Sequence, residues 1–212
     1  MMVVKIPSKS TLDIYDIGNG INILGVDAAK KISGGIIFPD SFSQNVPFSK
    51  DTLRAYKGTH ILFAYPGLSV NEICSLVSSY KGLGGEPLFA WQKWFRKEQF
   101  ADKKEKPGWY LLQKFHIPLS VNKSFIQQKK IVSGDSDIPS ACLLFYAMVA
   151  YFFQTSRRLF QNIYAQSSDF DDSGKLRICI GFFGENGPAI SFFWDEWKSN
   201  FIGIAPVIKQ IF

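Results

Sequence analysis

The sequence predicts an α+β fold, and two observations lead to that prediction. Residues 138–156, IPSACLLFYAMVAYFFQTS, hold no charged residue and follow a Ser- and Asp-rich start, which is typical of a helix buried in a core. After this stretch the hydrophobic period changes from helical to strand-like, in short segments separated by Gly, Asp and Asn turns. The segments follow one another too closely for crossover helices, so we expect helices first and antiparallel strands last.

The elements before this buried helix are predicted from capping residues and periodicity. Two capped helices are expected, at 49–60 and at 69–82, the second beginning near Ser69 and ending at Gly82. Between them HILFAYP, residues 60–66, predicts a buried strand, and WYLLQKF, residues 109–115, predicts another. Residues 88–101 predict a helix whose apolar stripe holds Leu88, Trp91, Trp94, Phe95 and Phe100.

The elements after residue 140 are a helix over 140–160 and four short strands. The strands are NIYAQSSDF (162–170), KLRICIGFF (175–183), PAISFFW (188–194) and IGIAPVIKQIF (202–212). A chain of 212 residues is long enough to bury one sizeable core. We expect a single globular domain over 1–212, in which 165–212 is a β-rich C-terminal region that presents a ligand-binding surface.

The amino terminus and the cysteines indicate in which cellular compartment the protein is expected. MMVVKIPSKSTLD has no basic start followed by an apolar core and a cleavage site, so an export signal is not predicted and a cytoplasmic location is expected. Cys74, Cys142 and Cys179 are odd in number and lie among apolar neighbours, which predicts buried free thiols. The uncharged stretch approaches the length of a membrane span, but its apolar part is about 14 residues, so a core helix and no membrane span are expected.

The net charge of +6 comes from the middle of the chain. Residues 93–130 carry ten basic and three acidic side chains. A basic stretch with interleaved tryptophans can bind nucleic acid by stacking bases in a charged groove, although solvated lysine faces are commoner. That alternative function uses the segment 91–114, with Lys93, Arg96, Lys97, Lys103, Lys104, Lys106, Trp91, Trp94 and Trp109.

Catalytic motifs are missing. The chain has two histidines, His60 and His116, far apart in sequence and each beside apolar residues, and it contains no metalloprotease, nucleophile-elbow or Cys-x-x-Cys motif. Both histidines are predicted to be structural. The sequence leaves open whether the protein is an enzyme, favours a non-enzymatic protein, and predicts no cofactor.

An acidic run could form a calcium loop or a turn. Asp169, Asp171, Ser173 and Gly174 match its first, third, fifth and sixth positions, but the ninth is Arg177 and the twelfth, normally Glu, is Ile180. Too few oxygens are available, so an acidic hairpin turn is favoured over a metal site. The pair Asp195 and Glu196 could serve as acid and base, and a solvated turn is favoured there too.

The strand 188–194 cannot bury all its aromatic residues on one face. Ala189, Ser191 and Phe193 fall on one side, while Ile190, Phe192 and Trp194 fall on the other. Either the strand is buried on both faces, or one face exposes a mixture of aromatic and serine side chains. Such a mixture is typical of a binding surface, because rigid rings supply area and small polar residues supply hydrogen bonds.

Four segments that span most of the chain carry a family resemblance: PFSKDTLRAYKGTHILFAYPGLSV, KPGWYLLQK, IPSACLLFYAMVAYFFQTSRRLFQNIYAQSSDFDDSGKLRICIGFF and WDEWKSNFIGIAPVIK. With these segments the chain resembles a family of uncharacterised bacterial proteins found largely in metagenomes. The last segment, with its closing FIGIAPVIK, also resembles the variable region of proteins diversified by retroelements. These proteins have a C-type-lectin-like fold related to the formylglycine-generating enzyme, whose cysteine pair and metal site are not found here.

The resemblance implies a set of substitutable positions on an invariant frame. The substitutable, ligand-facing residues would be Ala189, Ser191, Phe192, Phe193, Trp197, Ser199 and Phe201. The frame would be Phe183, Gly187, Trp194, Asp195, Ile202 and Gly203. The expected function is therefore non-enzymatic binding of a protein or other macromolecule by a variable aromatic and serine surface, with Trp194 holding the scaffold beneath it.

Overall fold

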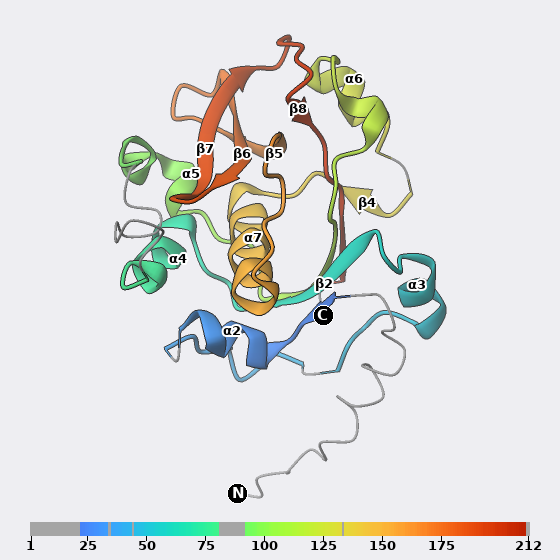
Figure 1. Cartoon of the computed structure of the whole chain (residues 1–212), viewed down its shortest axis with the longest axis vertical. Coiled ribbons are helices and arrows are strands. Elements are labelled where there is room, and N and C mark those ends of the chain that lie inside the picture. Colours follow the sequence, from blue (N-terminus) through green and yellow to red (C-terminus); the bar gives the residue numbers. More distant parts are fainter. Residues whose placement is uncertain (1–21, 34, 44, 81–91, 133, 211–212) are drawn as a thin grey trace, which may run out of the picture.

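Two β-sheets and a long helix between them form the fold (Figure 1). The computed structural model describes residues 22–33, 35–43, 45–80, 92–132 and 134–210. Helices and strands are both abundant, and each sheet contains parallel and antiparallel pairs. The predicted α+β class is confirmed.

The first sheet has the strand order β1-β2-β3-β9-β4. Its strands are β1 (Asn22–Leu24), β2 (His60–Tyr65), β3 (Gly108–Gln113), β9 (Val207–Gln210) and β4 (Ser136–Asp137). β1 runs parallel to β2, and the other neighbours are antiparallel. β2 is buried along its whole length because Ile61 and Phe63 pack in the central core while Leu62 packs on the other side, against Leu53 of α3 (Lys50–Ala55). This two-sided burial explains the continuous apolar run that predicted the strand.

The second sheet has the strand order β7-β6-β5-β8. Its strands are β5 (Tyr164–Phe170), β6 (Leu176–Gly184), β7 (Gly187–Trp194) and β8 (Ile202–Gly203). The predicted antiparallel pairing is confirmed for β5, β6 and β7, whereas β8 runs parallel to β5. β7 and β8 are therefore the edges of this sheet.

The helix α7 (Ala141–Thr155) contacts both sheets. All residues from Ala141 to Tyr151 are buried, so every side of the helix needs apolar residues and the sequence carries no charge there. Asp169 of β5 caps its first turn by accepting the Ala141 N–H at 2.7 Å, and it also pairs with Lys103. The predicted core helix is confirmed, and no helix in the described ranges has the length and apolar character needed to cross a membrane.

The remaining helices are short. They are α2 (Val26–Ile32), α4 (Val70–Val77), α5 (Gln99–Asp102) and α6 (Phe125–Lys129), with the 3₁₀ turns η1 (Trp94–Lys97) and η2 (Pro118–Ser120). α2, α4 and α5 pack against α7. The helix predicted to start near Ser69 is confirmed, because the Glu72 N–H donates to Ser69 Oγ at 3.2 Å and the Ser69 N–H donates to Glu72 Oε2 at 2.8 Å.

The prediction of one helix over 88–101 is wrong for its described part. η1 and α5 are separate turns, because Glu98 between them has an extended backbone with φ −76° and ψ 142°. Phe95 and Phe100 are buried as expected, while Trp94 remains 37% exposed. Leu88 and Trp91, which belong to the same prediction, lie outside the described residues. The helix predicted over 69–82 ends earlier than expected, because α4 stops at Val77 and residues 78–80 are not helical; its predicted last residue, Gly82, is not described.

The expected order of helices first and strands last describes the chain only from α7 onward. β2 and β3, both predicted as strands, precede α7, and so does β1, which was not predicted. The strand predicted over 202–212 divides into β8 and β9, which belong to different sheets. The terminal segment thus crosses from the second sheet to the first, and residues 211–212 lie outside the described part.

Two local predictions concern the cysteines and the acidic run. Cys74, Cys142 and Cys179 are buried and free, as predicted. The acidic run forms the predicted hairpin turn between β5 and β6: Asp171 Oδ1 accepts the Leu176 N–H at 3.0 Å and the Lys175 N–H at 3.2 Å.

Candidate ligand-binding face

The candidate site lies on the outer face of the second sheet, which we define as the face turned away from α7. On the inner face Ile178, Ile180 and Ile190 belong to the central core with α7. Residues directly opposite each other in the register share a face, and the register pairs Cys179 with Ser191 and Arg177 with Phe193. The outer face therefore carries Arg177, Cys179, Ser191 and Phe193.

Five aromatic residues gather on this face and its adjoining loop. Tyr164 of β5 lies 4.7 Å from Phe182 and 5.7 Å from Phe193 between ring centroids. Phe201 lies 6.1 Å from both Phe182 and Phe193, and Trp197 lies 6.3 Å from Phe193. These spacings are those of favourable ring pairs. We call Tyr164, Phe182, Phe193, Trp197 and Phe201 the aromatic cluster.

Two members of the aromatic cluster reach the solvent most. Trp197 is 49% exposed and Phe182 is 38% exposed, whereas Tyr164, Phe193 and Phe201 are half-buried. Burial raises the pKa of the Tyr164 hydroxyl, and a hydrogen bond with Ser191 opposes that shift. At neutral pH Tyr164 is therefore an uncharged phenol beside a serine hydroxyl, and the surface combines rings with neutral polar groups.

A β-bulge places Phe182 on the outer face. Between the pairs Gly181–Ala189 and Gly184–Gly187, β6 advances three residues while β7 advances two, so β6 holds one extra residue. Without the bulge, strict alternation after Ile180 would turn Phe182 inward and Phe183 outward. Instead, Phe183 is 1% exposed and packs against Phe152, 5.3 Å away, while Phe182 joins the aromatic cluster.

The bulge is strained at Phe182 and crowded at Gly181. Phe182 has φ 41°, which is unusual for a bulky residue and costs about 1–3 kcal/mol. A Cβ at Gly181 would lie 1.9 Å from the backbone oxygen of Ile163, so only glycine allows β5 and β6 to approach here. The Phe182 N–H donates to the same Ile163 oxygen at 3.1 Å, which fixes the bulge against β5.

The other end of the outer face is held by a buried ion pair. Arg177 donates from Nε to Asp195 Oδ1 at 2.7 Å and from a terminal nitrogen to Asp195 Oδ2 at 2.9 Å. Its guanidinium lies 3.3 Å from the ring centroid of Phe125 and 4.1 Å from that of Phe170. The expected solvated turn is therefore wrong for Asp195, which anchors the start of the loop that carries Trp197.

Backbone hydrogen bonds hold this loop along its length. The Asp195 and Ser199 carbonyls accept the N–H groups of Phe125 and Asn122, both at 2.8 Å, and the Phe201 carbonyl accepts the Tyr164 N–H at 2.8 Å. Trp197 and Phe201 thus project from a loop whose backbone is fixed at three points. Little ordering entropy would be lost there on binding.

The structure brings four of the seven predicted ligand-facing residues together and separates the other three. Ser191, Phe193, Trp197 and Phe201 belong to the face or its loop. Ala189 lies opposite Gly181 on the outer face but is buried, at 5% exposed. Ser199 is 8% exposed, and its Oγ accepts the Phe201 N–H at 3.2 Å. Neither residue offers surface to a ligand.

Phe192 points to the opposite face of β7 and contacts a different segment. Its ring lies 5.0 Å from that of Trp94 in η1, edge to face. Next to it Gln92 closes the edge of β7 by donating to the Ile190 carbonyl at 3.0 Å and accepting the Ile190 N–H at 2.7 Å. Phe192 is therefore exposed, at 41%, but it is not part of the aromatic cluster.

The implied frame is buried except at two positions. Phe183, Gly187, Ile202 and Gly203 are buried. Asp195 is the half-buried partner of Arg177 described above. The expectation that Trp194 holds the scaffold is wrong, because Trp194 is 52% exposed at the end of β7.

Sequence reasoning missed two members of the aromatic cluster. Tyr164 could have been found, because the strand 162–170 lies close in sequence to the aromatic strands and Tyr164 is its only exposable ring before Phe170. Phe182 could not be found in this way, since its orientation depends on the bulge.

The basic segment is less open than the nucleic-acid alternative requires. Trp109 is 4% exposed and donates from Nε1 to the Ser43 carbonyl at 2.9 Å, so its predicted role in stacking bases is wrong. Lys103 pairs with Asp169, and Lys104 pairs with Glu72. The hydrogen bond to Asp169 raises the pKa of Lys103. Two of the six basic residues thus have carboxylate partners.

The titratable groups form no catalytic constellation in the described part of the chain. His60 is buried beside Tyr56 and lies 2.8 Å from Thr59 Oγ1, and its pKa falls to about 4, first through burial and then through the charge of Lys114. Burial also lowers the pKa of His116 and raises that of the Cys179 thiol. No group of three His, Cys, Asp or Glu residues able to hold a metal ion occurs among the described residues.

Comparisons of the chain with protein-family models, with curated proteins and with solved structures returned no match. The family resemblance and the C-type-lectin-like fold therefore stay predictions.

Proposed function

We propose that the protein is a non-enzymatic binding protein that holds a protein ligand through its aromatic cluster. The observation that carries the proposal is the set of five contacting rings on the outer face, with Trp197 and Phe182 exposed at 49% and 38%. Aromatic side chains dominate the energetic centres of protein interfaces, because they offer large, stiff, apolar area. Ser191 beside Tyr164 adds neutral hydrogen-bonding capacity.

The strain at Phe182 supports the same proposal. A φ of 41° costs free energy that the fold alone does not require, because a glycine at this position would make the same bulge without that cost. Retaining phenylalanine there makes sense if the exposed ring is needed on the surface. Strained backbone of this kind concentrates at ligand contacts.

The proposal includes diversification of this surface. Substitution would be tolerated best at the exposed position Trp197 and, with a larger loss of packing, at the half-buried positions Ser191, Phe193 and Phe201. A near-copy of the DNA that codes for residues 181–205, differing mainly at adenines and lying beside a reverse-transcriptase gene, would support this part of the proposal. Absence of such a near-copy from the source genome would remove it and leave the binding proposal standing.

Site-specific photo-crosslinking tests the binding proposal. A photoreactive amino acid is placed at Trp197 in one variant and at Ile37, which is 82% exposed and outside the aromatic cluster, in another. A protein captured from position 197 and not from position 37 is then purified. Its dissociation constant is measured for the unaltered chain, for a face variant (Phe182→Gly with Trp197→Ser) and for a control variant (Ile37→Ser with Leu119→Ser).

The face variant is expected to bind at least about 30-fold more weakly, because losing a central aromatic residue costs about 2 kcal/mol or more. The control variant removes two apolar residues that are 82% and 74% exposed and should bind as the unaltered chain does. Equal affinity of the face variant and the control would refute the proposal. If the unaltered chain forms concentration-dependent dimers and the face variant does not, the ligand of the aromatic cluster is a second copy of the chain and not another protein.

A further inference from the structure

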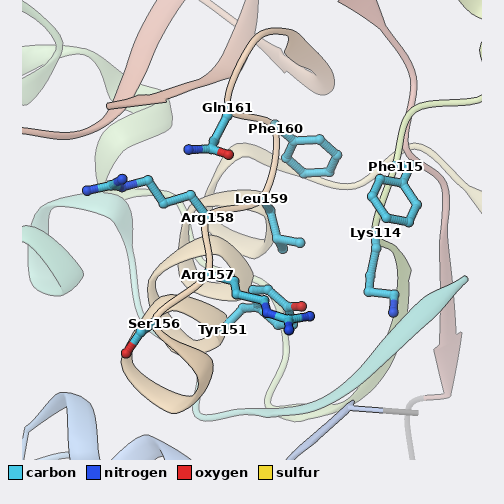
Figure 2. Close-up of a pocket in the computed structure, with 9 residues that line it drawn as sticks. All are labelled: Lys114, Phe115, Tyr151, Ser156, Arg157, Arg158, Leu159, Phe160 and Gln161. Atoms are coloured by element: carbon cyan, nitrogen blue, oxygen red, sulfur yellow. The ribbon is translucent and has the colours of Figure 1, made fainter. Parts of the chain in front are cut away.

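A cavity of about 430 Å³ lies at the carboxyl end of α7, and no residue of the aromatic cluster lines it (Figure 2). Its walls come from three parts of the chain: Lys114 and Phe115 after β3, Tyr151 in the last turns of α7, and the loop 156–161 that follows the helix. Cavities of this volume are typical of sites for small molecules.

Two positive charges flank this cavity. In Figure 2, Lys114 extends along one side, and Arg157 extends from the other side toward it. Arg158 is directed away from them, and its guanidinium lies 5.6 Å from the ring centroid of Phe152 and 5.9 Å from that of Phe183. The charge available inside the cavity is therefore that of Lys114 and Arg157.

These charges have no acidic partner in the described part of the chain. No Asp or Glu occurs among the described residues that line the cavity, and neither Lys114 nor Arg157 makes an ion pair with a described carboxylate. The pKa of Lys114 is lowered, first by burial and then by the charge of Arg157. Lys114 is thus a partly buried cation beside the exposed cation Arg157, and an anion bound between them would relieve their repulsion.

The negative end of the α7 helix dipole stabilises only one of the two cations, Arg157. The partial negative charge at this end favours a cation such as Arg157 directly after the last turn, with or without a ligand. Lys114 comes from the end of β3 and gains no such stabilisation, yet it lies close enough to lower the pKa of His60 as well. A second cation here is therefore unfavourable for the unliganded protein.

The loop that carries Arg157 is fixed in a strained conformation. Ser156 has φ 57° and Phe160 has φ 51°, so both are left-handed residues without being glycine. Leu159 and Phe160 are buried, at 4% and 6% exposed, and the Arg157 N–H donates to Thr155 Oγ1 at 3.2 Å. The backbone that places Arg157 is thus anchored on both sides, as preorganised ligand sites are.

We infer that this cavity binds a small phosphate monoester whose organic part is aromatic or apolar. Two converging cations match the double negative charge of a phosphate monoester, and a lysine with an arginine is a common phosphate-binding pair. Phe115, Leu159 and Phe160 give the cavity apolar walls for the organic part. The site shares no lining residue with the aromatic cluster, and the inference does not rest on the proposed protein binding.

Phenyl phosphate is the probe for this site, titrated into the full chain and followed by the amide NMR signals. Signals of the loop 156–161 and of Lys114 and Phe115 are expected to shift and saturate. Inorganic phosphate should bind more weakly, because it lacks the ring, and phenol should not bind. Lys114→Gln and Arg157→Gln should each raise the dissociation constant about tenfold or more, since each removes a charged hydrogen-bonding group.

Lys129→Gln is the matched control, because it removes one exposed lysine charge from α6, outside the cavity. It should leave the dissociation constant unchanged, and Lys114→Arg should keep binding within about threefold. Lys114→Gln should also leave the urea midpoint of the unliganded chain unchanged or raised, because it removes a cation that burial and Arg157 disfavour.

Three outcomes would overturn the inference. The first is no saturable shift at phenyl phosphate concentrations on the order of 10 mM. The second is equal weakening by Lys114→Gln and Lys129→Gln, which would mean attraction by net charge alone. The third is a set of shifted signals confined to the basic segment 93–106 and not reaching the cavity.

Discussion

Two substitutions of Phe182, by alanine and by glycine, distinguish the stability that its ring contributes from the free energy that its left-handed backbone costs. The ring is 38% exposed, so either substitution forfeits part of its burial, about 1–2 kcal/mol. Contact with Tyr164 at 4.7 Å adds about 0.5–1 kcal/mol. We expect Phe182→Ala to lower the free energy of unfolding by about 1.5–3 kcal/mol.

Phe182→Gly removes the same ring but also removes the strain of the left-handed backbone. At φ 41° the loss of strain stabilises the fold by about 1–2 kcal/mol, and the greater conformational freedom of glycine in the unfolded chain destabilises it by about 0.5–1 kcal/mol. Phe182→Gly should therefore be more stable than Phe182→Ala by about 0.5–1 kcal/mol. In a regular strand the alanine variant is normally the more stable of the two, so the expected order of stability is reversed at Phe182.

Phe201 supplies the matched control. It is a half-buried ring of the same cluster, and it is not among the described non-glycine residues with positive φ. There alanine should be more stable than glycine by about 0.5–1 kcal/mol. Urea unfolding of the four variants, with equal slopes, gives the comparison. If alanine is the more stable residue at both positions, Phe182 is not strained and the argument drawn from its strain is wrong.

Three further predictions concern the ion pair, the buried histidine and the glycine of the bulge. Asp195→Asn should cost about 2–4 kcal/mol in urea unfolding, because it leaves its buried arginine partner unpaired, whereas Asp27→Asn in an exposed pair should cost less than about 0.5 kcal/mol; similar costs would contradict this. His60 has a folded pKa of about 4 against 6.5 for the free side chain, so its protonation favours the unfolded state and stability falls as the pH drops through that interval. His60→Gln should remove about 2–3 kcal/mol of the loss measured between neutral pH and about pH 4, and identical pH profiles would refute the assignment. Gly181→Ala should cost about 3 kcal/mol or more, because its Cβ would lie 1.9 Å from a backbone oxygen, while Gly184→Ala, whose Cβ meets nothing nearer than 3.9 Å, should cost under about 1 kcal/mol in thermal unfolding; equal costs would show that the bulge tolerates a side chain.

Elements with strong local signals were predictable. α7 was found because the uncharged residues 138–156 follow a helix-start signal, and the start of α4 was found because Ser69 is a typical N-cap residue. β2 was found from a continuous apolar run. In each case the determining interactions lie within a few residues of one another, or depend only on the total apolar content of the segment.

The helix over 88–101 and the strand over 202–212 were predicted wrongly for a common reason. Each segment satisfies a periodic pattern along its length, but the tertiary structure divides it between different neighbours. Glu98 turns the chain between η1 and α5, where its side chain accepts the N–H of Asp172 at 2.8 Å. β8 and β9 separate because each pairs with a strand that is distant in sequence. Periodicity contains no information about such partners.

The sequence by itself determined that the carboxyl-terminal third would be β-rich and would hold more aromatic residues than one sheet face can bury. Which rings reach the solvent was decided by the tertiary structure. One extra residue in β6 reverses the alternation, so Phe182 is turned out and Phe183 in, and the loop bound to β5 adds Trp197 and Phe201. Likewise, Lys114 and Arg157 lie 43 positions apart in sequence, and only the packing of α7 against the first sheet brings them to one cavity. The physical reasons differ. Side-chain direction in a strand has a period of two, so one extra residue in β6 reassigns the aromatic surface. The cavity instead depends on a long-range contact between the loop after α7 and the chain after β3, and no local pattern in the sequence encodes that contact.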